Sequence, residues 1–197
     1  MSFNTIGSST FLDAFGAGQF NQAQYDDLVA GHKEPLRELF GKEGILADVN
    51  AATSSILVGL VLDRANDAST LLSGNWAKRQ ADLAAFASPA ALWSTYGADT
   101  TLYANTKNAV IGVVGNGPLT TAEGEGYVSS AADRTIWLVL DPTNFQKLFG
   151  RELYEVSWTK NGKPENEGLG WTGNLQLDAS IAVGSITGLA IPRSVTF

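Results

Sequence analysis

The sequence predicts an α+β fold: a split βαβ (ferredoxin-like) antiparallel sheet with helices on one face, and extra helices at the N-terminus. Short apolar runs at 56–62, 135–140 and 153–156 are typical of buried strands. Capped amphipathic stretches separate the first two runs, and one short helical stretch separates the last two. We expect Leu57–Leu62, Thr135–Leu140 and Leu153–Val156 to be neighbours in one sheet, because each is too short to be stable alone.

The first 54 residues are expected to form a helical annex. Ser8–Phe15, Asn21–Gly31 and Glu34–Phe40 have the pattern of short helices, and Ala47–Ser55 has the small residues of a linker. The expected α+β core spans residues 55–190, and residues 191–197 are expected to form an extended tail. The core begins with the continuous apolar run Ile56–Leu62, the pattern of a strand buried on both faces.

Helices are expected between the first two strands. Asn75–Ala87 is predicted to be helical, with Trp76, Leu83 and Phe86 toward the core. Ser88-Pro89 begins a helix that runs to Tyr96, and Asp99 caps a longer helix over Thr100–Val114.

The segment Arg134–Tyr154 predicts a strand, a helix and a second strand with almost no connecting residues. Asp141-Pro142 supplies an N-cap and a proline at the first helical position, and Gly150 ends the helix. Apolar residues at i, i+3 and i+4 give the helix one buried face. The predicted core residues of the whole domain are Leu60, Trp137, Leu138, Phe145, Phe149 and Leu153.

A hairpin with a long second arm is expected after this segment. Asn161-Gly162 is a two-residue turn signal, and Lys163–Gly170 is polar and rich in glycine, as in an exposed flap. Trp158 and Trp171 flank the flap and are candidate interface residues. The alternative for both is ordinary packing within the hairpin.

Composition limits the partners. The 197 residues include 13 basic and 20 acidic side chains, a net charge of −7, with a pI near 4.6. This charge disfavours nucleic acid and anionic membrane surfaces as partners. The absence of cysteine excludes disulfides and thiolate sites. No apolar run reaches the length of a membrane span, so no membrane partner is expected, and the sequence does not indicate an oligomeric state.

Signals of catalysis are weak. His32 is the single histidine, which excludes metal sites built on several histidines, and its place after a helix favours a simple surface role. The acidic pairs Asp26-Asp27, Glu123/Glu125 and Glu165/Glu167 lie in polar surroundings, where solvated carboxylates are expected. The glycines after 112 lack phosphate-loop spacing. We therefore expect no catalytic residues, no metal and no cofactor.

Several motifs together resemble the activation domain, or prodomain, of sedolisin-type serine-carboxyl peptidases, the family that includes kumamolisin. The strand, short helix, Phe-Gly-x-x-Leu and Tyr order after Arg134 is the most specific of them. The segments that carry the resemblance, in chain order over about residues 55–190, are Leu57–Arg64, Phe86–Pro89, Leu92, Tyr96–Asp99, Phe149–Tyr154, Gly173–Leu175 and Asp178–Leu189. Asp178 stands where the family's closing helix usually has proline, and residues 1–54 have no counterpart.

The resemblance implies a non-catalytic zymogen segment. Its partner would be the cognate peptidase catalytic domain, for which it would serve as intramolecular chaperone and protease inhibitor, and its location would be secreted or extracytoplasmic. The family's catalytic serine lies in a Gly-Thr-Ser setting that is missing here. In the family the joining segment passes through the catalytic cleft, so Ile191, Pro192 and Arg193 are expected to be extended, exposed and in contact with the enzyme.

The acidity suggests release at low pH. Asp63, Asp133, Asp141 and Glu152 are the candidate groups. If each pairs with a basic group of the catalytic domain, the bound state favours the charged carboxylates, so acidification would loosen the complex. Two alternatives to the prodomain remain open: a free-standing module that binds protein or glycan through the tryptophan flap, and a small acid hydrolase with paired carboxylates.

Overall fold

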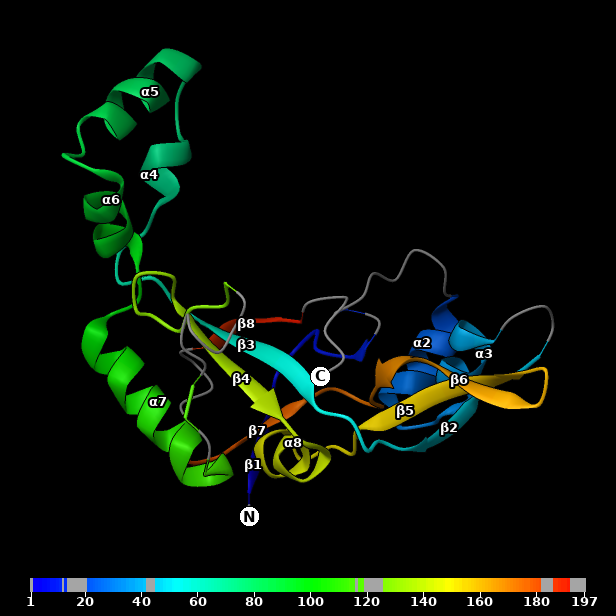
Figure 1. Ribbon diagram of the computed structural model, residues 1–197. Helices are drawn as coiled ribbons and strands as arrows, with labels where there is room; N and C mark the ends of the chain where they lie inside the picture. The colour runs from blue at the N-terminus through cyan, green and yellow to red at the C-terminus, as the bar shows by residue number, and fades with distance from the viewer. Residues whose placement is uncertain are drawn as a thin grey trace.

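The computed structural model describes residues 2–11, 13, 21–41, 45–115, 117–118, 126–181 and 186–191. It confirms the α+β class, with three antiparallel sheets in the described part of the chain (Figure 1). The central sheet has the order β4 (Thr135–Leu140), β3 (Ile56–Leu62), β8 (Ile186–Ala190). A second sheet joins β2 (Asp48–Ala51), β5 (Tyr154–Lys160) and β6 (Lys163–Gly170), and a third pairs β1 (Phe3–Thr5) with β7 (Gln176–Asp178).

Strand β3 is the centre of the core because it pairs antiparallel with a strand on each side. Leu60 lies opposite Ile136 of β4 and Leu189 of β8. Every residue of β3 except Val61 is buried, as its continuous apolar pattern predicts. Gly59 has no side chain because the Trp137 ring lies over it, and an added Cβ would be only 2.8 Å from that ring. The sheet therefore requires a glycine at its middle.

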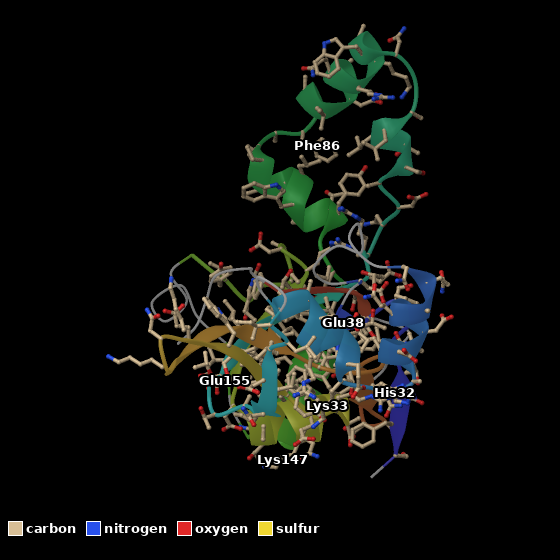
Figure 2. The ribbon with its side chains drawn as sticks, turned by 90° about the vertical axis from the view of Figure 1, so that its right-hand side faces the viewer. His32, Lys33, Glu38, Phe86, Lys147 and Glu155 are labelled. Carbon is tan, nitrogen blue, oxygen red and sulfur yellow. The ribbon has the colours of Figure 1, made fainter. Side chains whose placement is uncertain are left out.

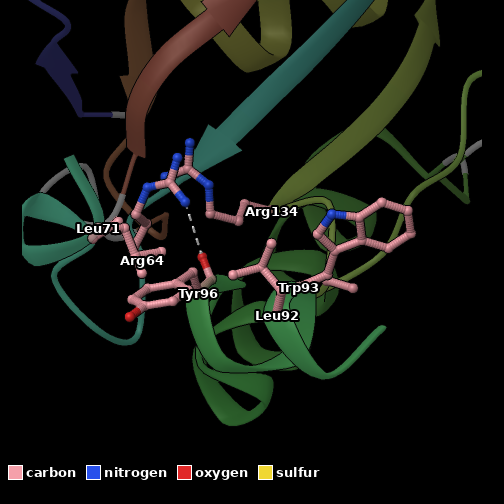
Figure 3. A pocket seen from close by; sticks show the side chains of 8 residues that line it. Arg64, Leu71, Leu92, Trp93, Tyr96 and Arg134 are labelled. Atoms are coloured by element: carbon pink, nitrogen blue, oxygen red, sulfur yellow. Dashed lines mark hydrogen bonds between the residues drawn. The ribbon is translucent and has the colours of Figure 1, made fainter. Parts of the chain in front are cut away.

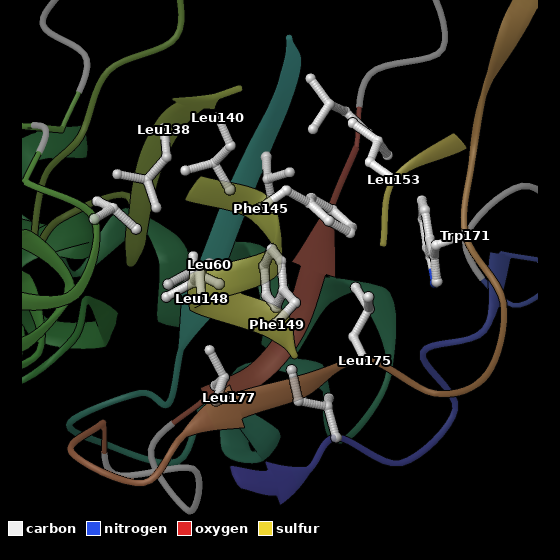
Figure 4. Close-up of a cluster of buried hydrophobic side chains, with 14 of the residues drawn as sticks. Leu60, Leu138, Leu140, Phe145, Leu148, Phe149, Leu153, Trp171, Leu175 and Leu177 are labelled. Atoms are coloured by element: carbon white, nitrogen blue, oxygen red, sulfur yellow. The ribbon is translucent and has the colours of Figure 1, made fainter. Parts of the chain in front are cut away.

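Two helices, α7 (Thr100–Val114) and α8 (Pro142–Phe149), contact one another and contribute to the same core. The Asp141 carboxylate accepts a 2.7 Å hydrogen bond from the Asn144 backbone N–H and caps α8. Gly150 ends the helix at a φ of +60°, in the left-handed region. The buried face of α8 packs against the core residues of β3 and β4 (Figure 4), and its members are Phe145, Leu148 and Phe149.

The expectation that Leu153–Val156 joins the central sheet is wrong. Strand β5 instead pairs with β2 and β6, and β8 takes the position beside β3. The reason is that residues 48–51, expected to be a linker, form a strand whose Val49 lies opposite Val156. Leu153 itself is buried, as predicted.

The closing segment also differs from expectation. A helix was expected within Asp178–Leu189, but the Asp178 carboxylate forms a turn by accepting from the Ser180 backbone N–H at 2.9 Å. Residues 186–190 are then the strand β8, which extends the central sheet. The chain therefore reaches Ile191 from a sheet, not from a helix.

The N-terminal segment contains strands as well as α2 (Gln22–Val29) and α3 (Glu34–Phe40). Phe11 links it to the core, because its ring lies 5.3 Å from the Trp171 ring and 5.7 Å from the Phe40 ring of α3. Trp171 in turn lies 5.9 Å from Phe145, which lies 5.0 Å from Phe149. These five rings form an aromatic column between α3 and α8.

Helices α4 (Ser69–Leu72), α5 (Trp76–Ala84) and α6 (Pro89–Tyr96) form an arm that protrudes from the body (Figure 1). The expectation that Trp76 and Leu83 are in the core is wrong: their exposed fractions are 73% and 41%. Phe86 is half-buried and packs within the arm, 5.9 Å from the Tyr96 ring (Figure 2). The arm is too small to bury its own apolar residues.

Among the predicted core residues, Trp137 is the exception. It is half-buried on the face of β4 opposite Leu138, where its ring lies 4.7 Å from that of Tyr127. Its backbone N–H donates to the Ser129 hydroxyl at 2.8 Å. The other five predicted core residues are buried.

Replacing Phe149 by Ala should lower the free energy of unfolding by about 3–5 kcal/mol, because the ring is fully buried between α8 and its surroundings. The control is Gln146→Ala on the exposed face of the same helix, which should change stability by less than about 0.5 kcal/mol. Urea denaturation of both variants measures this. Similar effects for the two variants would contradict the packing of α8.

Candidate interaction sites

The hairpin β5–β6 presents one of the predicted interface residues. Asn161 and Gly162 have φ angles of +52° and +75°, which fits the expected two-residue turn. Trp158 is half-buried, and the Lys160 Nζ lies 5.7 Å from its ring centroid, within range of a cation–π contact. Part of the Trp158 ring is therefore exposed to solvent.

Trp171 cannot serve as an interface residue in this structure, which corrects the sequence prediction. Its side chain is fully buried, and its indole Nε1–H donates a 3.0 Å hydrogen bond to the Ser9 carbonyl. The Ser9 hydroxyl in turn donates to the Ile6 carbonyl at 2.6 Å and accepts from the Leu175 N–H. Trp171 fastens the N-terminal segment to the core.

The four candidate pH-switch carboxylates are all exposed. Asp63 accepts from the Arg64 backbone N–H, and Asp133 accepts from the Ser130 hydroxyl at 2.6 Å. Asp141 caps α8, and Glu152 accepts from the Tyr154 hydroxyl at 2.7 Å. The Asp141 carboxylate is thus already engaged as the cap of α8, and any partner would have to contact it in that position.

Tyr154 is the titratable group most affected by its surroundings. Burial, together with the Glu152 carboxylate that accepts its hydrogen bond, raises its pKa to about 12. The Lys33 Nζ lies 4.1 Å from the centroid of the same ring. Tyr154 therefore joins the loop before α3 to the beginning of β5.

The C-terminal interface candidates are described only in part. Ile191 follows β8 directly, is half-buried and packs against the core. Pro192 and Arg193 lie outside the described residues. The expected exposure of the tail is therefore a prediction for the segment after Ile191.

The described residues offer little for catalysis. His32 is exposed, and its Nδ1 lies 3.3 Å from an Asp27 carboxylate oxygen. Within the described ranges, no group of three or more His, Cys, Asp or Glu residues is arranged to hold a metal. Among the helices of those ranges, none has the length and apolar character needed to cross a membrane.

A cavity of about 180 Å³ lies where the arm joins the body, and the sequence reasoning missed it. We call it the arginine notch; Figure 3 shows its two guanidinium groups, with Trp93 on another part of the wall. Two backbone hydrogen bonds fix this junction at 2.7 Å each, from the Ala65 N–H to the Gly97 carbonyl and from the Ala98 N–H to the Ala131 carbonyl. The side chains that define the notch are Arg64, Leu71, Leu92, Trp93, Tyr96 and Arg134.

Both arginines are held by backbone carbonyls. The Arg64 Nη1 donates to the Tyr96 carbonyl at 3.3 Å, and the Arg134 Nη1 donates to the Leu62 carbonyl at 3.0 Å. Burial and the neighbouring positive charge of Arg64 lower the pKa of Arg134, while the Asp63 carboxylate acts in the opposite direction. The two like charges are therefore near one another.

Comparison with models of protein families gives no match, and no curated protein matches the sequence significantly.

Replacing Trp171 by Phe should destabilise the fold by about 1–3 kcal/mol, because the Ser9 carbonyl would be left buried without its indole donor. The matched control is Trp76→Phe on the exposed arm, for which a change below about 0.5 kcal/mol is expected. Thermal and urea unfolding of both variants test this. Equal stability of the two would remove Trp171 as a fastening residue.

Stability should fall as pH rises from about 10 to about 12, and Tyr154 should contribute to the fall. The unfolded phenol releases its proton near pH 10, whereas the folded phenol, with its pKa raised to about 12, retains it. The contribution is thus fully present below pH 10 and is lost as pH rises through the folded pKa. Urea unfolding at several alkaline pH values should show a shallower fall for Tyr154→Phe and an intermediate one for Glu152→Gln. The same slope in all three proteins would contradict this.

Proposed function

We propose that the chain acts as the prodomain of a serine-carboxyl peptidase of the sedolisin type, binding and inhibiting the catalytic domain without catalytic residues of its own. The observation that carries the proposal is the position of β8 beside β3. It makes the last described strand a closing strand of the central sheet, from which the chain continues past Ile191.

The connectivity supports a split βαβ arrangement of the central sheet. Along the chain, β3 is followed by α7, by an isolated bridge at Ser130, by β4, by α8 and, after an insertion, by β8. In space, β8 lies beside β3, β3 beside β4, and Ser130 bridges to Thr135 at the start of β4. In chain order, β3 is the first position, Ser130 the second, β4 the third and β8 the fourth. Their order across the sheet is fourth, first, third, second, which is the order of a ferredoxin-like sheet.

Three features differ from the sequence resemblance. The first is the closing helix expected within Asp178–Leu189, where the structure has a turn and the strand β8. The strand expected directly after α8 is displaced by an insertion that holds β5, β6 and β7, so the closing strand comes more than thirty residues later. The second strand of the split arrangement is reduced to the Ser130 bridge and to the Ser129 hydrogen bonds with Trp137. The motifs before and within α8 are unaffected by any of these differences.

The two alternatives receive less support. A binding module that uses a tryptophan pair loses half of the pair, because Trp171 is buried. An acid hydrolase needs two carboxylates that converge on one cavity; the Asp26-Asp27 pair is exposed on α2, and no acidic residue lines the arginine notch. The prodomain proposal is supported by the strand order of the central sheet.

The test is inhibition in trans. The chain of residues 1–197 is mixed with a mature kumamolisin-type peptidase at neutral pH, and binding and residual peptide hydrolysis are measured. We expect binding with loss of activity, and at least about tenfold weaker inhibition by a chain ending at Ile191, because about 1.4 kcal/mol of tail contacts would be removed. Full activity with the intact chain would end the proposal.

Acid release is measured in the same complex. Affinity should fall from pH 7 to pH 3 if Asp63, Asp133 or Glu152 pairs with basic groups of the peptidase, since a carboxylate stabilised in the bound state loses that contribution once it is protonated. The triple Asn/Asn/Gln variant should show a flatter profile. Asp141 is left unchanged because it caps α8. A flat profile for the unmodified chain removes the electrostatic release and leaves the inhibition result intact.

A further inference from the structure

The arginine notch brings two positive charges together on an acidic chain. Its two guanidinium groups lie near one another at the base of the arm, in a molecule whose net charge is −7. Within the described residues, no carboxylate lies within 4.0 Å of the Arg64 or Arg134 guanidinium nitrogens. No salt bridge in this part of the chain offsets the repulsion between the two, and the Asp63 carboxylate reduces it from a longer distance.

We propose that the arginine notch binds a carboxylate of a partner polypeptide, an acidic side chain with large apolar neighbours. The proposal does not depend on the peptidase assignment. Guanidinium groups present forked N–H donors that match the two oxygens of a carboxylate. Each arginine here uses Nη1 for a backbone carbonyl, which holds the group in place and leaves its other donors for a ligand.

The walls of the notch favour a ligand with an apolar body. Trp93 is 57% exposed, and Leu71 and Leu92 are the larger aliphatic side chains that line the notch with it. A cavity of about 180 Å³ suits one side chain and not a drug-sized ligand. The net charge of the chain opposes polyanions such as nucleic acid, so an isolated carboxylate on a polypeptide is the better match.

Other apolar side chains are exposed elsewhere on the arm. Of the large apolar side chains that are exposed in the described residues, four lie on the arm: Leu72, Trp76, Leu83 and Trp93. Such a concentration on a protruding element is typical of a protein-binding surface. Apolar residues of the partner that flank its bound carboxylate would contact these side chains of the arm.

The backbone at Arg134, one of the two arginines of the notch, has an unfavourable conformation. Its φ is +57°, a conformation uncommon for a residue other than Gly, Asn or Asp. Its N–H donates to the Ala131 carbonyl, and its carbonyl accepts from the Leu62 N–H at 2.7 Å. Strained backbone of this kind occurs preferentially at functional sites.

The test uses the full chain and the capped peptide acetyl-Leu-Glu-Leu-amide, with acetyl-Leu-Gln-Leu-amide as the neutral control. Binding is followed in ¹H–¹⁵N spectra by the indole signal of Trp93, identified as the signal missing from Trp93→Phe. We expect the Glu peptide to shift this signal and to bind at least about tenfold more tightly than the Gln peptide, the ratio that a charged hydrogen bond supplies.

Single variants distinguish binding in the notch from nonspecific attraction between the peptide and any positive charge of the protein. Arg64→Gln and Arg134→Gln should each weaken binding of the Glu peptide at least about fivefold, and the matched control Lys160→Gln at the distant hairpin should leave it unchanged. Arg64→Lys and Arg134→Lys, which keep the charge, should recover part of the affinity. Urea unfolding of every variant identifies loss of fold as a separate cause.

Three results would overturn the proposal. The first is equal binding of the Glu and Gln peptides, and the second is a Trp93 signal that the Glu peptide does not shift. The third is a loss of binding in Lys160→Gln as large as in the arginine variants. Inorganic phosphate is titrated in parallel: a tighter shift with phosphate than with the peptide would assign the notch to a phosphate ligand instead.

Discussion

The aromatic column centred on Trp171 is the contact on which the rest of the structure depends. The molecule has separate sheets of only two or three strands, which is at or below the lower limit of size for independent stability. Trp171 is packed against Phe11 of the N-terminal segment and Phe145 of α8, and its indole N–H satisfies the Ser9 carbonyl. Large buried rings contribute more area than any other side chains, so this column merges the sheets into one core.

Local signals were sufficient for the elements around the central sheet. The Asp99 and Asp141 caps, the proline after Asp141 and the left-handed Gly150 act within four residues of the helix ends that they determine. The all-apolar run of β3 likewise identifies a strand buried on both faces. These predictions were correct because each depends on interactions between residues that are close together in the sequence.

Strand pairing and the notch depend on distant residues. Strand β2 reads Asp-Val-Asn-Ala, with no apolar run, and it exists because β5 supplies hydrogen-bond partners more than one hundred residues away. The burial of Trp171 depends on Phe11, and the notch combines Arg64, Trp93 and Arg134, so no periodicity could reveal either. The arm shows the opposite error: Trp76 and Leu83 have a core-like spacing, but the fold places no partner surface beside them.

The geometry of β8 separates the two proposed binding surfaces. Ile186 lies opposite Leu62, next to Asp63 and Arg64 where the notch begins, whereas Ala190 lies opposite Gly59 and leads away to Ile191. Four residues of strand span about 13 Å, so the tail leaves β8 about that far from the end nearest the notch. One partner that contacted both would be held at two points, and each contact would raise the effective concentration at the other. Because the surfaces share no residue, a change in the notch should lower the affinity of such a partner without removing the action of the tail, and the two contributions can be measured one at a time.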